Sequence, residues 1–283
     1  METLLKYKDF LNENRKPIMK YYAFDWDDNI LNMPTVIHME KLDGEQWVPQ
    51  DVSTEEFAKV RTLDNWRASE NAYIEFRDIG SRGQTAFIED AQNAISSGNF
   101  GPSWKKFLNC LTKGSIFAII TARGHEPDTI RKVVEYIIHN ILTEEQRNEM
   151  AANLTAFQDM FVQNFDFLRD ISIQTLISAY LDKCDFVGVS SPSFASKYPE
   201  LMGKSGIKNP EIAKIKALDE FIDRINIYGK QIGGSVSIGF SDDDKKTVKT
   251  IEKHFGEISP LYDDITFSVY DTSNPKETVK NKI

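Results

Sequence analysis

The sequence is poor in cysteine and histidine. Its 283 residues include two cysteines, Cys110 and Cys184, and four histidines, and neither set has the spacing of a metal or redox motif. So few cysteines exclude a disulfide-stabilised scaffold and are typical of a reducing compartment. We therefore expect a cytoplasmic protein.

Long apolar runs and an excess of positive charge are also missing. No apolar run reaches the ~18 residues of a membrane-spanning helix, and the first residues lack the apolar core of an export signal. We therefore expect neither export nor a membrane partner. The net charge of −9 disfavours a general nucleic-acid surface, although it leaves room for a small basic pocket. The 41% apolar and 27% charged residues are typical of a globular protein.

One apolar stretch ends on a group of acids. Residues 19–25 are rich in aromatic side chains, which favours a buried strand, and Asp25, Asp27 and Asp28 stand at its end. Carboxylates are costly to bury without partners, so the strand should end at a surface crevice. Open α/β sheets bind ligands in such a crevice. A solvated acidic turn is the alternative interpretation of this stretch alone.

Four more apolar segments are expected to be strands, and amphipathic helical patterns separate them. Two of these strands also end on functional groups, one on Thr121 and one on the acidic run 241–244. Alternation of strands and helices predicts a mostly parallel α/β sheet with helices on both faces. Parallel strands would bring the three functional ends to one edge of the sheet. The four segments are residues 115–120, 184–190, 235–240 and 264–270.

The remaining segments suggest how the chain is divided. Residues after the first strand are expected to form an inserted, mostly helical region, with a capped helix opening at Thr54. Helical periodicity through Met160, Phe161, Phe165 and Leu168 makes the second connection longer than a crossover requires. The expected parts are an N-terminal arm (1–17), a core (18–34, 114–127 and 184–275), an inserted cap-like region (35–113), a helical crossover (128–183) and a tail (276–283).

The acids at two strand ends favour a hard cation. Magnesium takes oxygen ligands and is often held by one or two carboxylates beside a substrate phosphate. A carboxylate nucleophile can form an aspartyl-phosphate, and a second acid nearby can protonate the leaving oxygen and later activate water. A threonine hydroxyl and a lysine ammonium would suit phosphate oxygens.

These motifs, taken together, resemble those of haloacid dehalogenase-like (HAD) phosphatases. Residues 24–31 look like the first motif, Asp-x-Asp-x-Thr/Val, and residues 119–123 look like the second, a strand ending in Ser or Thr. Lys214 is similar to the lysine of the third motif, and residues 238–243 to the fourth. All four occur in the family's order. The resemblance covers residues 19–34, 114–127 and 184–272, and it implies a Rossmann-like core with helical insertions.

The resemblance implies roles for the acids. Asp25 would be the nucleophile and a metal ligand. Asp27 would be the general acid and base, and its backbone carbonyl would also ligate the metal. Asp242 or Asp243 would complete a magnesium site, while other acids of that run cap the next helix. Asp27 favours phosphatase chemistry, since dehalogenase and phosphonatase members lack this acid.

The resemblance also implies phosphate-binding residues. Thr121 would bind the transferring phosphoryl group, and Lys214 would balance its charge and that of Asp25. Arg123 is either a substrate contact or an ion-pair partner. Asn29, where the family usually has Thr or Val, is a further candidate substrate contact and could alter the turn after the nucleophile. Three other lysines compete for the role of Lys214, namely Lys204, Lys208 and Lys216.

The implied function is magnesium-dependent hydrolysis of a phosphomonoester, a small metabolite or a nucleotide, through an aspartyl-phosphate. Three alternatives stay open. The first is a binding or scaffold protein of the same fold, against which the intact pair Asp25 and Asp27 argues. The second is a phosphotransferase with an acceptor other than water. The third is a phosphatase of nucleic-acid ends, which the net charge disfavours.

Overall fold

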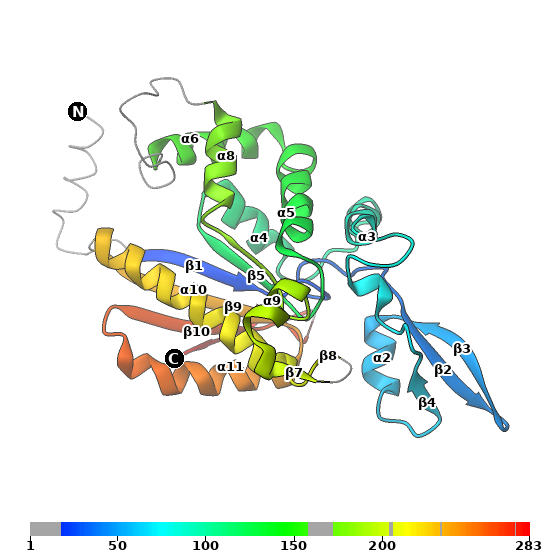
Figure 1. The fold of residues 1–283 in the computed structure, drawn as a ribbon. Coiled ribbons are helices and arrows are strands. Elements are labelled where there is room, and N and C mark those ends of the chain that lie inside the picture. The colour runs from blue at the N-terminus through cyan, green and yellow to red at the C-terminus, as the bar shows by residue number, and fades with distance from the viewer. Residues whose placement is uncertain (1–17, 158–171, 204–205, 233, 275) are drawn as a thin grey trace.

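A six-stranded sheet forms the centre of the protein in the computed structural model (Figure 1). Its strand order is β11-β10-β9-β1-β5-β6. The five strands from β10 to β6 run parallel, and β11 is antiparallel at the edge. The predicted mostly parallel α/β sheet is therefore confirmed, and the arrangement is compatible with a Rossmann-like fold. The strands are β1 (Ile18–Phe24), β5 (Phe117–Thr121), β6 (Asp185–Gly188), β9 (Ser235–Asp242), β10 (Ile265–Asp271) and β11 (Val279–Lys282).

The structure describes residues 18–157, 172–203, 206–232, 234–274 and 276–283. The arm expected at residues 1–17 and the helical pattern expected at Met160–Leu168 lie outside the described residues. Within the described part of the chain, no helix is both long enough and apolar enough to cross a membrane.

Helices cover both faces of the sheet (Figure 1). On one face, Phe107 of α4 packs its ring against Phe24 and Phe117, with ring centroids 5.6 and 5.5 Å away. On the other face lie α10 and α11. Because both faces are covered, the central strand β5 is buried at every position. The helices are α3 (Thr85–Ser96), α4 (Trp104–Thr112), α5 (Pro127–Tyr136), α6 (Glu144–Ala156), α8 (Ile173–Leu181), α9 (Pro192–Lys197), α10 (Pro210–Ile232) and α11 (Lys245–Ile258).

The direction of the strand order changes at β1. The chain passes from β1 to β5 and β6 on one side and then returns to β9 on the other side of β1. Such a switch opens a crevice beyond the carboxyl ends of the two adjacent strands. Phe24 of β1 stands in register with Ser241 of β9, and the backbone N–H of Asp25 donates to the Ser241 carbonyl at 2.9 Å. Asp25 and Asp242 therefore leave the sheet side by side.

The inserted region differs from the mostly helical prediction. A second sheet, of order β3-β2-β4, and the helix α2 (Thr54–Val60) form a lobe, residues 37–78, that projects from the main body (Figure 1). Its own small core consists of Ile37, Met39, Val52 and Ala72. β2 and β3 form a hairpin, and burial alternates along β2. In the sequence the hairpin is marked by Asp43-Gly44 at the turn, where Gly44 has a φ of +62°. The strands are β2 (Ile37–Asp43), β3 (Gln46–Val52) and β4 (Trp66–Ala68).

Some single elements of the inserted region and the tail agree with the sequence-based expectation, and others differ from it. The helix expected at Thr54 is present, and Ser53 and Glu56 form its capping box. α3 and α4 were assigned to the cap-like region, but Phe87 and Phe107 belong to the main core. The expected tail at 276–283 contains the edge strand β11, whose exposed, polar residues give no periodic signal in the sequence. A short hairpin, β7 (Met202–Gly203) and β8 (Gly206–Ile207), was also not expected.

Candidate active site

Three carboxylates meet at the carboxyl ends of β1 and β9. One oxygen from each of Asp25, Asp242 and Asp243 lies within 4.8 Å of the others. Asp25 directly follows β1, Asp242 is the last residue of β9, and both side chains are buried. We call these three residues the acidic cluster. The topology of the sheet brings them together from positions more than 200 residues apart in the chain.

The side chain of Lys214 enters the acidic cluster from the first turns of α10. Its Nζ lies 2.8 Å from Oδ1 of Asp25 and 2.7 Å from Oδ2 of Asp242, and the residue is only 5% exposed. Among the competing lysines in the described residues, Lys208 instead donates to the backbone carbonyl of Glu200. Lys204 lies outside the described residues. The structure therefore brings Lys214 to the position that the resemblance gave it.

The electrostatics of the acidic cluster are unbalanced. Burial raises the pKa of Asp25 and of Asp242 above the usual value, although Lys214 acts in the opposite direction. Burial and then the neighbouring Asp242 raise the pKa of Asp243 to about 8. Burial opposes the charge of Lys214, but the two carboxylates outweigh it, and the pKa of this lysine is raised. With all three carboxylates ionised and Lys214 protonated, the cluster carries two negative charges in excess.

The donor set of the acidic cluster fits a magnesium ion. Carboxylate oxygens are its preferred ligands, and two positive charges would cancel the excess negative charge. Asp244, the next acid in the run, is engaged elsewhere, because its side chain accepts from Lys246 N and caps α11. The carboxylate of Asp27 is also engaged elsewhere, which leaves only its backbone carbonyl for the ligand role implied by the resemblance.

Asp27 is held by Arg123, which follows β5. Nε of Arg123 donates to Oδ2 of Asp27 at 2.8 Å, and Nη2 donates to Oδ1 at 2.6 Å. The guanidinium lies over the rings of Phe76 and Phe87, with Cζ 4.4 and 5.0 Å from the two centroids. Arg123 is 2% exposed, whereas 18% of the Asp27 side chain is exposed. The structure thus gives Arg123 an ion pair with Asp27, the second of the two roles considered for it.

Thr121 stands at the same edge of the sheet as the acids. It is the last residue of β5, which pairs directly with β1, and it is buried. Its Oγ1 accepts a hydrogen bond from the backbone N–H of Arg123 at 3.3 Å. The three functional strand ends predicted from the sequence therefore share one edge.

Asn29 lies inside the protein and connects the strand ends. Its Nδ2 donates to the carbonyls of Asp25 and Ser241 at 2.9 and 3.2 Å, and its Oδ1 accepts from the hydroxyls of Ser103 and Thr272. The side chain has no exposed surface. Both of its amide atoms are engaged by neighbouring groups, so Asn29 fixes the loop after β1 rather than making the substrate contact considered from the sequence.

Two contacts between the lobe and the loops of the site have no signal in the sequence. Thr54, the first residue of α2, donates to Oδ2 of Asp28 at 2.8 Å, and Asp28 has a left-handed φ of +55°. On the other side, Asp78 accepts from the backbone N–H of Glu126, from Thr129 and from Nδ1 of His125. The lobe thus touches both the loop after β1 and the loop after β5.

His125 is buried beside Arg123 and is neutral at physiological pH. Its Nδ1 lies 2.9 Å from Oδ1 of Asp78, and because a carboxylate only accepts, Nδ1 carries the proton. Its Nε2 faces Nη1 of Arg123 at 3.5 Å. Burial, followed by the charge of Arg123, lowers the pKa of His125 to about 4.

Magnesium should stabilise the folded protein, because it would cancel the excess charge of the acidic cluster. At a magnesium concentration of about 100 Kd the gain is ~2.7 kcal/mol, which thermal unfolding would show as a Tm higher by roughly 5–10 °C. Asp243→Asn should raise the Tm without metal and shrink the magnesium-dependent increase. A magnesium effect of equal size in wild type and Asp243→Asn would contradict the site.

The neutral His125 predicts a stability that falls in acid. Between pH 6.5 and about 4 the unfolded chain binds a proton at this residue that the folded protein refuses, so stability is lost as the pH falls through this window. His125→Asn keeps a donor toward Asp78 and removes the titrating group. Chemical denaturation at pH 7 and pH 4 should show about 3 kcal/mol less pH dependence in the variant than in wild type. Identical pH profiles would disprove the neutral, buried state.

Asn29→Ala should be strongly destabilising, because it removes the side-chain partner of the buried Asp25 carbonyl and of the Thr272 hydroxyl and weakens the bonding of Ser103 and Ser241. At ~1–3 kcal/mol for each buried group, the loss should exceed about 3 kcal/mol. The exposed Asn32, three residues further on, provides a matched control. Asn32→Ala should change the free energy of unfolding by no more than about 0.5 kcal/mol. A small, equal effect of both changes in urea denaturation would refute the structural role of Asn29.

No protein-family model, no curated protein and no solved structure matches this chain. The likeness to HAD phosphatases is therefore a resemblance carried by the four sequence motifs.

Proposed function

We propose that this protein is a magnesium-dependent phosphomonoesterase of the HAD type that works through an aspartyl-phosphate. One observation carries the proposal. A buried lysine ammonium lies between two buried carboxylates at the switch point of a parallel sheet, with a third carboxylate beside them. A structural ion pair would require one carboxylate. The extra acids are costly to bury without a further cation, and that cost favours a functional site.

In the first step, a carboxylate oxygen of Asp25 attacks the phosphorus of the ester. The new bond joins Asp25 to phosphorus, and the bond between phosphorus and the ester oxygen breaks. Lys214 would stabilise both the nucleophile and the transferring group, because its ammonium already lies 2.8 Å from Asp25. A magnesium ion held by Asp25, Asp242 and Asp243 would supply neutralising charge at the phosphate oxygens.

Asp27 is the partly exposed acid two residues beyond the nucleophile. It would give a proton to the leaving oxygen in the first step. In the second step it would take a proton from the water that attacks phosphorus, while the bond between phosphorus and Asp25 breaks and inorganic phosphate leaves. The double hydrogen bond from Arg123 fixes the orientation of its carboxylate. Thr121, at the end of the neighbouring strand, is the candidate hydroxyl for the phosphoryl group. The lobe, which contacts both loops, is the candidate cap over the substrate.

The lobe favours a small substrate over a nucleic-acid end. In residues 37–78 acidic side chains outnumber basic ones, so the lobe adds no positive surface for a phosphate backbone. Small phosphomonoesters need only the charge of the site itself. A panel of sugar phosphates and nucleotides is therefore the first substrate screen.

Asp25→Asn should abolish hydrolysis of an aryl phosphate while the fold persists, because the change is isosteric. We expect a loss of at least about 10³-fold in kcat, since an amide oxygen is a poor nucleophile. The matched control is Asp64→Asn, an exposed acid in the lobe, which should keep wild-type rates. Colorimetric assays with and without magnesium measure both.

Three outcomes would change the proposal. Activity that persists in Asp25→Asn would remove the nucleophile role. Absence of turnover across the panel in wild type would favour a binding protein. Capture of the phosphoryl group by added alcohols would favour a phosphotransferase.

A further inference from the structure

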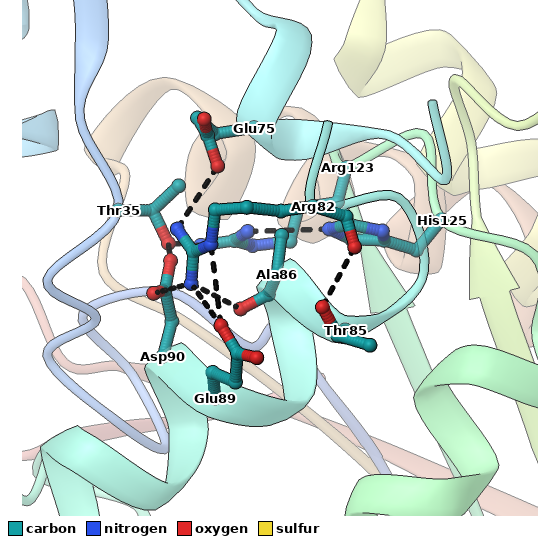
Figure 2. A network of polar contacts seen from close by, with 9 residues as sticks. All are labelled: Thr35, Glu75, Arg82, Thr85, Ala86, Glu89, Asp90, Arg123 and His125. Atoms are coloured by element: carbon teal, nitrogen blue, oxygen red, sulfur yellow. Dashed lines mark hydrogen bonds and ion pairs between the residues drawn. The ribbon is translucent and has the colours of Figure 1, made fainter. Parts of the chain in front are cut away.

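A line of buried polar contacts continues from Asp27 and Arg123 into the inserted region, and Figure 2 shows the part from Arg123 outward. Nη2 of Arg123 donates to Oγ1 of Thr35 at 2.8 Å, and Oγ1 of Thr35 lies 2.6 Å from Oδ2 of Asp90 on α3. Thr35 and Asp90 are 2% and 4% exposed. Neither residue touches the acidic cluster, and the mechanism above makes no use of them.

The direction of each hydrogen bond in this line is fixed by the chemistry of the groups. A guanidinium has only donors, and an ionised carboxylate has only acceptors. The Thr35 hydroxyl must therefore donate to Asp90 and accept from Arg123. The charge of Asp90 thereby turns the oxygen lone pairs of Thr35 toward the guanidinium.

The contact with Thr35 completes the constraint on Arg123. Nη2 donates to both Asp27 and Thr35, so both of its hydrogens have partners. The rings of Phe76 and Phe87 lie against the guanidinium. Without the Thr35 hydroxyl, Nη2 of Arg123 would keep its hydrogen bond to Oδ1 of Asp27 but would lose the second contact that fixes its position.

Asp90 is itself held by Arg82, the residue at the outer end of the line. Nη2 of Arg82 lies 2.7 Å from Oδ1 of Asp90, and Arg82 also contacts Glu75 and Glu89 (Figure 2). Positive and negative groups therefore alternate from Asp27 to the surface. Because Asp90 is paired with Arg82, its buried charge is compensated without a direct contact with Arg123.

We propose that Thr35 and Asp90 are positioning residues that, through Arg123, hold the Asp27 carboxylate in the orientation required for proton transfer to the leaving oxygen. The inference rests on the proposed phosphatase function and deepens it. A merely structural role for the same contacts would lower stability but would leave proton transfer in the folded enzyme unchanged.

The test compares two esters that differ in their need for a proton. The leaving group of phenyl phosphate is poor and depends on the general acid, whereas that of 2,4-dinitrophenyl phosphate leaves without help. The measured quantity is the ratio of their kcat/KM values on one preparation with magnesium. Partial unfolding cancels in this ratio, and kcat/KM reports the step in which the leaving group departs.

The variants separate the hydroxyl and the charge from the packing. Thr35→Val removes the hydroxyl at almost constant volume, and Thr35→Ser keeps it. Asp90→Asn removes the charge. Glu89→Gln is the matched control, since Glu89 contacts the same Arg82 from the exposed side of α3 and does not reach Thr35. If Asp90→Asn does not fold, Thr35→Val alone carries the test.

We expect Thr35→Val and Asp90→Asn to lower kcat/KM for phenyl phosphate about tenfold more than for the dinitrophenyl ester, a part of the ~10²–10⁴ that general acids contribute. Thr35→Ser and Glu89→Gln should keep the wild-type ratio. Equal losses for both esters in Thr35→Val would overturn this inference and leave the proposed function standing. A wild type that hydrolyses neither ester would overturn both.

Discussion

The site depends on the buried charge balance around Lys214. One ammonium lies between Asp25 and Asp242, and Asp243 adds a third carboxylate within reach of the same point. Burial makes each carboxylate resist ionisation, and Lys214 offsets only part of that cost. With all three carboxylates ionised the site would carry two excess negative charges, which a divalent cation would offset. The arrangement therefore sacrifices some stability for binding capacity, as functional sites commonly do.

The sheet topology explains why these groups meet. The strand order reverses at β1, so that β1 and β9 are neighbours and the acids that follow them lie at the same edge of the sheet. Asn29 fixes this edge of the sheet, because its hydrogen bonds join the loop after β1 to β9, to the start of α4 and to the segment after β10. The lobe and the loop after β5 hold the second acid, Asp27, from the opposite side through Arg123. The proposed nucleophile, Asp25, and the proposed general acid, Asp27, are thus fixed by different parts of the chain.

Sequence patterns predicted the core strands because each is an apolar run that stops at a polar group. The same patterns predicted Asp25, Thr121 and Asp242 at one edge of the sheet, and the family resemblance added Lys214, which α10 brings to Asp25 and Asp242. The sequence-based prediction lacks the hairpin of the lobe although Asp43-Gly44 marks its turn, because the helical patterns that follow it favour a mostly helical region. The partners of Asn29, up to 243 residues away, and the contact of Arg123 with Asp27 leave no local signal, so only the folded structure reveals them.

The most direct test of the account is to identify the covalent intermediate on the protein. Wild-type protein would be mixed with magnesium and 2,4-dinitrophenyl phosphate, quenched in acid within the first turnover, digested, and mapped by mass spectrometry. The account predicts one phosphoryl group on the peptide that contains Asp25. This group should disappear when the quench is delayed until the substrate is used up, and it should be absent from Asp25→Asn. Turnover without any phosphorylated peptide, or a phosphoryl group on another residue, would contradict it.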